Sequence, residues 1–198
     1  MEYALLSVAG LLAGVLGGML GVGGSVVMIP AMVWIYALSG RPETIHQYQA
    51  AAMVVNFLLI GPAVLRHARA GAIRRDVWSH LAPAAVVGVL GGVAVSRLGV
   101  FTGANERYLR YVFGAFQLYV AGYNLWRMRR GPAGQDPPAP PARLRAWPKL
   151  AVGAATGFAA GLLGIGGGAV AVPAMQVVLR LPLRQAIGTS AATILTTA

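Results

Sequence analysis

The stretch GLLAGVLGGMLGVGGSVVMIPAM, residues 10–32, recurs as GAATGFAAGLLGIGGGAVAVPAM, residues 153–175. With a shift of 143 positions the two stretches agree at 11 of 23 residues, and most of these are glycine or proline. Glycine and proline dictate backbone shape, so the repeat predicts an unusual chain path that is built twice. In an apolar chain, two copies of a broken, small-residue helix favour a transporter whose site lies between repeats.

Composition indicates an integral membrane protein. Hydrophobic residues make up 57% of the chain and charged residues 11%, with a mean hydropathy of +0.67, whereas soluble domains carry about 25% charged residues. Several stretches that lack Asp, Glu, Lys and Arg are long enough to supply membrane spans. Four of them lie between Glu2 and Arg41, Glu43 and Arg66, Arg110 and Arg127, and Lys149 and Arg180. We therefore expect an all-α polytopic membrane protein in a lipid bilayer.

The net charge of +11 would suggest nucleic acid as the partner of a soluble protein. Here the basic residues fall between apolar runs, so we read them as topology determinants and expect no nucleic acid. The absence of cysteine excludes disulfides and thiolate chemistry. The N-terminus lacks a basic region before its apolar run, which favours a retained first span over a cleaved signal peptide.

Apolar segments are predicted at about 3–20, 25–39, 50–65, 81–97, 108–126, 150–163, 169–180 and 186–198. The glycine runs at 21–24 and 164–168 separate two close pairs of segments, and each pair could be a hairpin or one broken span. If both are hairpins, the loops 66–80, 127–149 and 180–185 share one side and hold 12 of the 16 basic residues. This asymmetry favours hairpins, with the basic loops in the cytoplasm of a bacterium and the chain in its inner membrane.

Five segments separate the starts of the two copies, and an odd number inverts the second copy. The predicted fold is thus an inverted repeat of helical hairpins broken at glycine-rich motifs. We expect a first repeat at 1–130, a Pro-rich cytoplasmic linker at 131–148 and a second repeat at 149–198. The linker could be read as an adaptor ligand, but a semi-rigid spacer fits better. The second repeat lacks two segments that the first has, so we expect a truncated form of a longer chain.

The glycines divide into two groups. A four-residue ladder, Gly10, Gly14 and Gly18 with Gly153, Gly157 and Gly161, has the spacing that lets helices pack closely in lipid. The second group is too closely spaced for a packing stripe and exposes backbone N–H groups at a helix N-terminus, which suits an anion. A tight turn is the alternative for this group. It comprises Gly21, Gly23, Gly24 and Ser25, and Gly164, Gly166, Gly167 and Gly168.

Other residues could assist such a site. Gln49, Asn56, Thr189 and Ser190 are uncharged polar residues in or beside apolar segments, and could complete the hydrogen-bond shell of an anion or bond between helices instead. Pro30 and Pro173 should kink the second arm of each hairpin. We expect no Asp, Glu or Lys inside an apolar segment, which favours weakly coupled transport over proton coupling.

Several kinds of site are not supported. The GxGxxA pattern at 164–169 lacks a preceding strand and a downstream acidic residue, and no GK[ST] follows either glycine run, so nucleotide-binding motifs are rejected. The three histidines, His46, His67 and His80, fall in predicted loops without metal-ligand spacing. We expect no metal, no cofactor and no catalytic residue.

The doubled GxxGxGGG-then-Pro pattern and the AIGTSA stretch at 186–191 resemble the sulfite exporter TauE/SafE family of membrane anion permeases. The resemblance implies transport of sulfite, a sulfonate or another small organic or sulfur-containing anion across the bacterial inner membrane. Two departures concern the substrate: Ser25 replaces a fourth glycine, and QYQA at 47–50 replaces IGTS. A non-transporting membrane scaffold is the alternative, a membrane-embedded enzyme is less favoured, and a homo-oligomer is compatible with the sequence.

Overall fold

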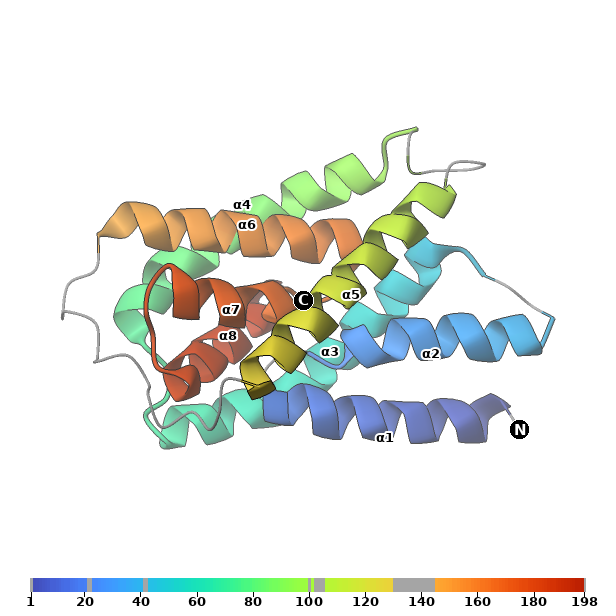
Figure 1. Ribbon diagram of the computed structural model, residues 1–198, viewed down its shortest axis with the longest axis horizontal. Coiled ribbons are helices and arrows are strands. Elements are labelled where there is room, and N and C mark those ends of the chain that lie inside the picture. The colour runs from blue at the N-terminus through green and yellow to red at the C-terminus, as the bar shows by residue number, and fades with distance from the viewer. Residues whose placement is uncertain are drawn as a thin grey trace.

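The computed structural model describes residues 2–20, 23–40, 43–99, 101, 106–129 and 145–197, and the predicted linker lies almost wholly outside them. The described part of the chain folds into eight α-helices and contains no strand (Figure 1). The helices are α1 (Glu2–Leu20), α2 (Ser25–Leu38), α3 (Ile45–Arg69), α4 (Arg75–Ser96), α5 (Glu106–Arg129), α6 (Ala146–Leu163), α7 (Gly168–Val177) and α8 (Leu183–Thr197). The predicted all-α fold is confirmed.

Helices α3, α4 and α6 begin earlier than hydropathy predicted. At the start of α3, the backbone N–H of Thr44 donates to Gln47 Oε1 over 2.8 Å, a polar cap that an apolar window does not detect. These earlier starts, together with the later end of α3 at Arg69, correct two predictions. All three histidines lie inside helices rather than in loops, and Lys149 lies inside α6, where it is buried.

Both glycine-separated pairs are hairpins. Helix α2 packs back against α1, and α7 against α6 (Figure 1). At a rise of about 1.5 Å per residue, the 14-residue α2 and 10-residue α7 are about 21 and 15 Å long, less than the roughly 30 Å hydrocarbon core. Each hairpin thus joins a long helix to a short one. In Figure 1, α1 and α6 run in opposite directions, as inversion requires, although the symmetry of the repeats remains a prediction.

The glycine ladder of α6 packs against α4, as predicted. A Cβ on Gly157 would collide with the backbone carbonyl of Ala85, and one on Gly88 would collide with that of Ala154. The prediction of close helix packing is not met at the two ladder glycines of α1 whose surroundings are described, Gly10 and Gly14. Gly10 has no atom within 4 Å of its Cβ position, and Gly14 meets only the side chain of Leu59.

The outer surface of the bundle is apolar and polar side chains are turned inward. On α3, Val54 and Leu58 are 62% and 68% exposed, whereas Gln49 and Asn56 are buried. Helices α3 and α4 have the length and composition needed to cross a bilayer. This arrangement suits lipid outside and a polar site within.

Candidate functional site

The two glycine breaks meet near the middle of the molecule. Gly23 has a φ of +88°, and its Cβ position lies 3.4 Å from the carbonyl oxygen of Ile165. Ile165 is fully buried and packs in a cluster that includes Ile29 and Ala52 of the first repeat. The two turns are thus adjacent, although more than 140 positions separate them in the sequence.

Asn56 lies between the two breaks. Its Oδ1 accepts the backbone N–H of Ser25 over 3.1 Å, and its Nδ2 donates to Ser25 Oγ over 2.8 Å. The same Nδ2 lies 2.8 Å from the Cβ position of Gly166. Because an amide group carries two N–H donors and the bond to Ser25 uses one, the second remains beside the second break.

The second break is a run of left-handed glycines. Gly164, Gly166 and Gly167 have φ values of +68°, +68° and +77°, which residues with a Cβ rarely adopt. Helix α7 begins at Gly168 without a side-chain cap. In the described part of the chain, no acceptor is found for the N–H groups of residues 166–169. Buried N–H groups that point from a helix N-terminus favour a bound anion.

Thr156 was not singled out in the sequence and lies at this break. It is 3% exposed, and its Oγ1 has no hydrogen-bond partner in the described ranges of the chain. Its Cγ2 is 2.9 Å from the Cβ position of Gly167. Thr156 directly precedes Gly157 of the ladder and is the one hydroxyl-bearing residue of α6, which was the available signal.

Gln49 contributes mainly to packing. Its Nε2 donates to the carbonyl of Leu162 near the end of α6 over 3.3 Å. Its Cβ lies 2.5 Å from the Cβ position of Gly164, so the side chain covers that glycine. Gln49 therefore borders the second break and uses one of its two amide N–H donors on the protein.

The remaining predicted residues have varied surroundings. Gly24 packs against α1, where its Cβ position is 3.2 Å from the carbonyl of Ala13. Thr189, a residue of α8, lies beside the start of α4, where its Oγ1 accepts the N–H of Arg74 over 3.1 Å. Ser190 is buried beside it in α8, and Gly168 is the buried first residue of α7. Gly21 lies outside the described residues.

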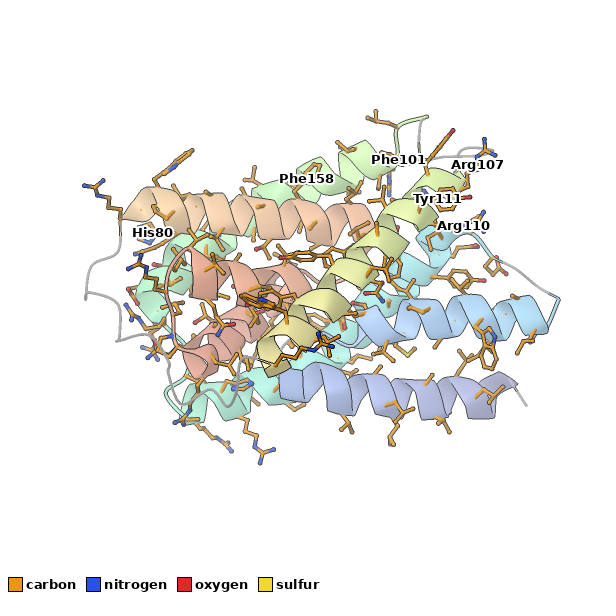
Figure 2. All side chains as sticks on the ribbon, in the orientation of Figure 1. His80, Phe101, Arg107, Arg110, Tyr111 and Phe158 are labelled. Atoms are coloured by element: carbon orange, nitrogen blue, oxygen red, sulfur yellow. The ribbon has the colours of Figure 1, made fainter. Side chains whose placement is uncertain are left out.

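A charged cluster surrounds that end of α4. Arg74 forms an ion pair with Asp76 (Nε to Oδ1, 2.8 Å), and Lys149 donates to the backbone carbonyl of Asp76 over 2.9 Å. His80 lies at the same end of the molecule (Figure 2). The hydrogen bond that Arg74 donates to the Asp76 carboxylate raises the pKa of Arg74, so its guanidinium stays charged. Thr189 thus contacts this cluster through the N–H of Arg74, and its role in the anion site remains a prediction.

Pro30 explains one contact that the sequence did not predict. A proline has no N–H, so Pro30 leaves the carbonyl of Val26, four residues earlier, without its helical partner. Gln117 of α5 donates its Nε2 to that carbonyl over 2.6 Å. Pro173 is buried inside α7, and the kinks predicted at both prolines remain predictions.

The donors at the meeting point are neutral N–H and O–H groups. Among the described residues, no group of three or more His, Cys, Asp or Glu side chains is placed to hold a metal ion. The arrangement can therefore donate hydrogen bonds to an anion shielded from lipid. Figure 2 shows the side chains on these helices.

Comparison with known proteins agrees with this architecture. The chain is similar to a "Probable membrane transporter protein" of Xylella fastidiosa, at 30% identity over 92% of this chain and 66% of the relative. It is also similar to one of Methanocaldococcus jannaschii, at 24% identity over 94% of this chain and 66% of the relative. The chain thus matches about two thirds of the length of these relatives. No solved structure matches it.

The family comparison covers nearly the whole chain. The model of the family described as "Sulfite exporter TauE/SafE" matches residues 6–198, which include both glycine breaks and every helix except the first residues of α1. The chain is an all-α membrane protein and belongs to the sulfite exporter TauE/SafE family.

Proposed function

We propose that this protein is a multi-pass transporter for a small anion, with sulfite, a sulfonate or another small organic or sulfur-containing anion as substrate. The observation that carries the proposal is the run of buried N–H groups at residues 166–169, which have no acceptor among the residues that the structure describes. Membership of the TauE/SafE family supports a transport function, as do the names of the relatives, which describe probable membrane transporters.

The chemistry of the meeting point favours an anion over a cation or a neutral solute. The N-terminus of α7 contributes the positive end of a helix dipole. None of the residues that line the two breaks (Gly23, Ser25, Asn56, Thr156 and Gly166) carries a negative charge. Backbone amides can bind an oxyanion without a lysine or arginine, which would be costly to bury in a membrane.

Burial of the break implies a transport cycle that opens it. Every residue from Leu163 to Ala169 is buried, so a bound anion would be closed off from lipid. Two short helices that meet near the centre could open the site alternately to each side by rocking of the repeats. We expect the basic end, with Arg74 and Lys149, to face the cytoplasm of a bacterium and the chain to lie in its inner membrane.

The mode of coupling is part of the proposal. Lys149 is a buried charged residue, and it lies in the cluster with Asp76 rather than at the glycine breaks. We therefore expect weakly coupled, uniport-like transport. A strong dependence of flux on a pH gradient, with the chain alone in liposomes, would contradict this expectation.

Flux measurement tests the function. The full chain in proteoliposomes should show saturable flux of sulfite, sulfate, sulfoacetate or acetate. Gly167→Val should abolish the flux, because its Cβ would meet Thr156 and the backbone has a positive φ. Gly114→Val on α5 is the matched control and should retain the flux, because nothing lies within 4 Å of its Cβ position. Absence of any saturable anion flux would favour a non-transporting scaffold.

A further inference from the structure

We propose that the two glycine breaks have different roles: the second binds the anion, with the Thr156 hydroxyl as one of its ligands, and the first is closed by Asn56. This inference rests on the proposed anion transport. It replaces the symmetrical site that the repeated sequence suggests, and it adds a residue that the repeat does not identify.

The N-terminus of α2, at the first break, already has a partner. The N–H of Ser25, the first residue of the helix, is accepted by Asn56 Oδ1 over 3.1 Å, and Ser25 Oγ accepts from Asn56 Nδ2 over 2.8 Å. These two bonds join α2 to α3. A helix N-terminus whose N–H is satisfied by another helix offers less to a ligand.

The N-terminus of α7, at the second break, has no such partner. Gly168 stands where the first copy has Ser25, so no side chain is present to pair with a neighbouring helix. The helix lacks a side-chain cap. The N–H groups of residues 166–169 have no acceptor in the described part of the chain. The first N–H of α7 is therefore free of any described acceptor, whereas the first N–H of α2 is bonded to Asn56.

Thr156 supplies the independent observation. Threonine hydroxyls inside helices commonly bond to the carbonyl one turn earlier, and Thr193 does so, donating to the Thr189 carbonyl over 2.9 Å. Thr156 is equally well buried, yet its Oγ1 has no partner. Because buried polar groups are almost always hydrogen-bonded, an unpaired hydroxyl on a side chain whose Cγ2 lies 2.9 Å from the Cβ position of Gly167 points to a ligand beside the second break.

The donors have the number and kind that a small oxyanion requires. The donors are the backbone amides of residues 166–169, the second N–H of Asn56 Nδ2, which lies 2.8 Å from the Cβ position of Gly166, and the unpaired hydroxyl of Thr156, whose methyl group lies against Gly167. Sulfite and the sulfonate group present three oxygens, each of which accepts hydrogen bonds. A neutral set of donors would bind such an anion and still release it.

Removal of the hydroxyl tests the inference. Thr156→Val keeps the branched shape and should raise the KM for anion flux roughly 10- to 100-fold, the loss expected for one hydrogen bond to a charged group. Thr156→Ser keeps the hydroxyl and should stay within about threefold of the parent chain. Thr193→Val is the matched control, because that buried hydroxyl bonds to its own helix, and its KM should also stay within about threefold.

The outcomes separate this inference from the proposed function. If the parent chain shows saturable flux and Thr156→Val has an unchanged KM, the inference is overturned and anion transport stands. An equal loss in Thr156→Val and Thr193→Val overturns it as well. If Thr156→Val fails to fold, Thr156→Ala provides the same test of hydroxyl loss. If the parent chain transports no anion, the proposed function itself fails.

Discussion

Replacing Asn56 by Asp should separate the structural role of this side chain from its proximity to the anion. An aspartate carboxylate can still accept the N–H of Ser25, and the Ser25 hydroxyl can rotate to donate to it. The two bonds that Asn56 makes to Ser25, at 3.1 and 2.8 Å, are therefore conserved in number. The variant should fold, with its thermal unfolding midpoint close to that of the parent chain.

The same substitution places a negative charge beside the second break. Asn56 Nδ2 lies 2.8 Å from the Cβ position of Gly166, so a bound anion would approach the new carboxylate closely. Two like charges about 4 Å apart repel by about 4 kcal/mol at an effective dielectric constant near 20. Each 1.4 kcal/mol is about a factor of ten in affinity, so binding should weaken by roughly two to three orders of magnitude.

The assay is initial-rate anion flux into proteoliposomes over a range of anion concentrations, with the amount of folded protein measured by size-exclusion chromatography. For Asn56→Asp we expect no saturation at concentrations that saturate the parent chain. A folded variant with an unchanged KM would refute the reasoning, because it would show that the anion does not come near Asn56.

Two further predictions concern the fold that holds the site. Gly157→Ala should lower the free energy of unfolding by about 1–3 kcal/mol, because its Cβ would collide with a backbone carbonyl of α4. Gly10→Ala is the control and should not lower it, because nothing among the described residues lies within 4 Å of that Cβ position. Denaturant titration in detergent compares the two variants, and equal losses would contradict the packing of α6 on α4. Gln117→Leu should lower the free energy of unfolding by about 1–3 kcal/mol, because it leaves the Val26 carbonyl unpaired. Pro30→Ala restores a helical N–H for that carbonyl, so the double variant should regain most of the lost stability. Additive losses in this double-mutant cycle would contradict the role of Gln117.

The chain path could be predicted from the sequence because glycine, proline and charge patterns act locally. The run at 21–24 and the Gly164–Gly168 run end one helix and start the next in the predicted places. Glycine permits the left-handed conformations found at Gly164, Gly166 and Gly167. Hydropathy located the middle of each helix but not its polar first turn, which is why Lys149 was assigned to a loop.

The partners of individual polar side chains could not be predicted. Gln49 and Thr189 bond to atoms 113 and 115 positions away in the sequence, and only tertiary packing brings such groups together. Thr156 was overlooked because a threonine among glycines and alanines is typical of helix packing in lipid. The free carbonyl at Val26 follows from Pro30, but nothing local indicates that Gln117 would pair with it.

The central claim is that backbone amides of the second break bind the anion. The direct measurement is an amide NMR titration of the detergent-solubilised full chain labelled with ¹⁵N-glycine, using sulfite and sulfoacetate. We predict that the amide protons of Gly166, Gly167 and Gly168 shift downfield and saturate at a concentration matching the KM for flux, while those of Gly23 and Gly24 shift less. Saturable transport with no shift at residues 166–168, or with the larger shifts at Gly23 and Gly24, would contradict the account.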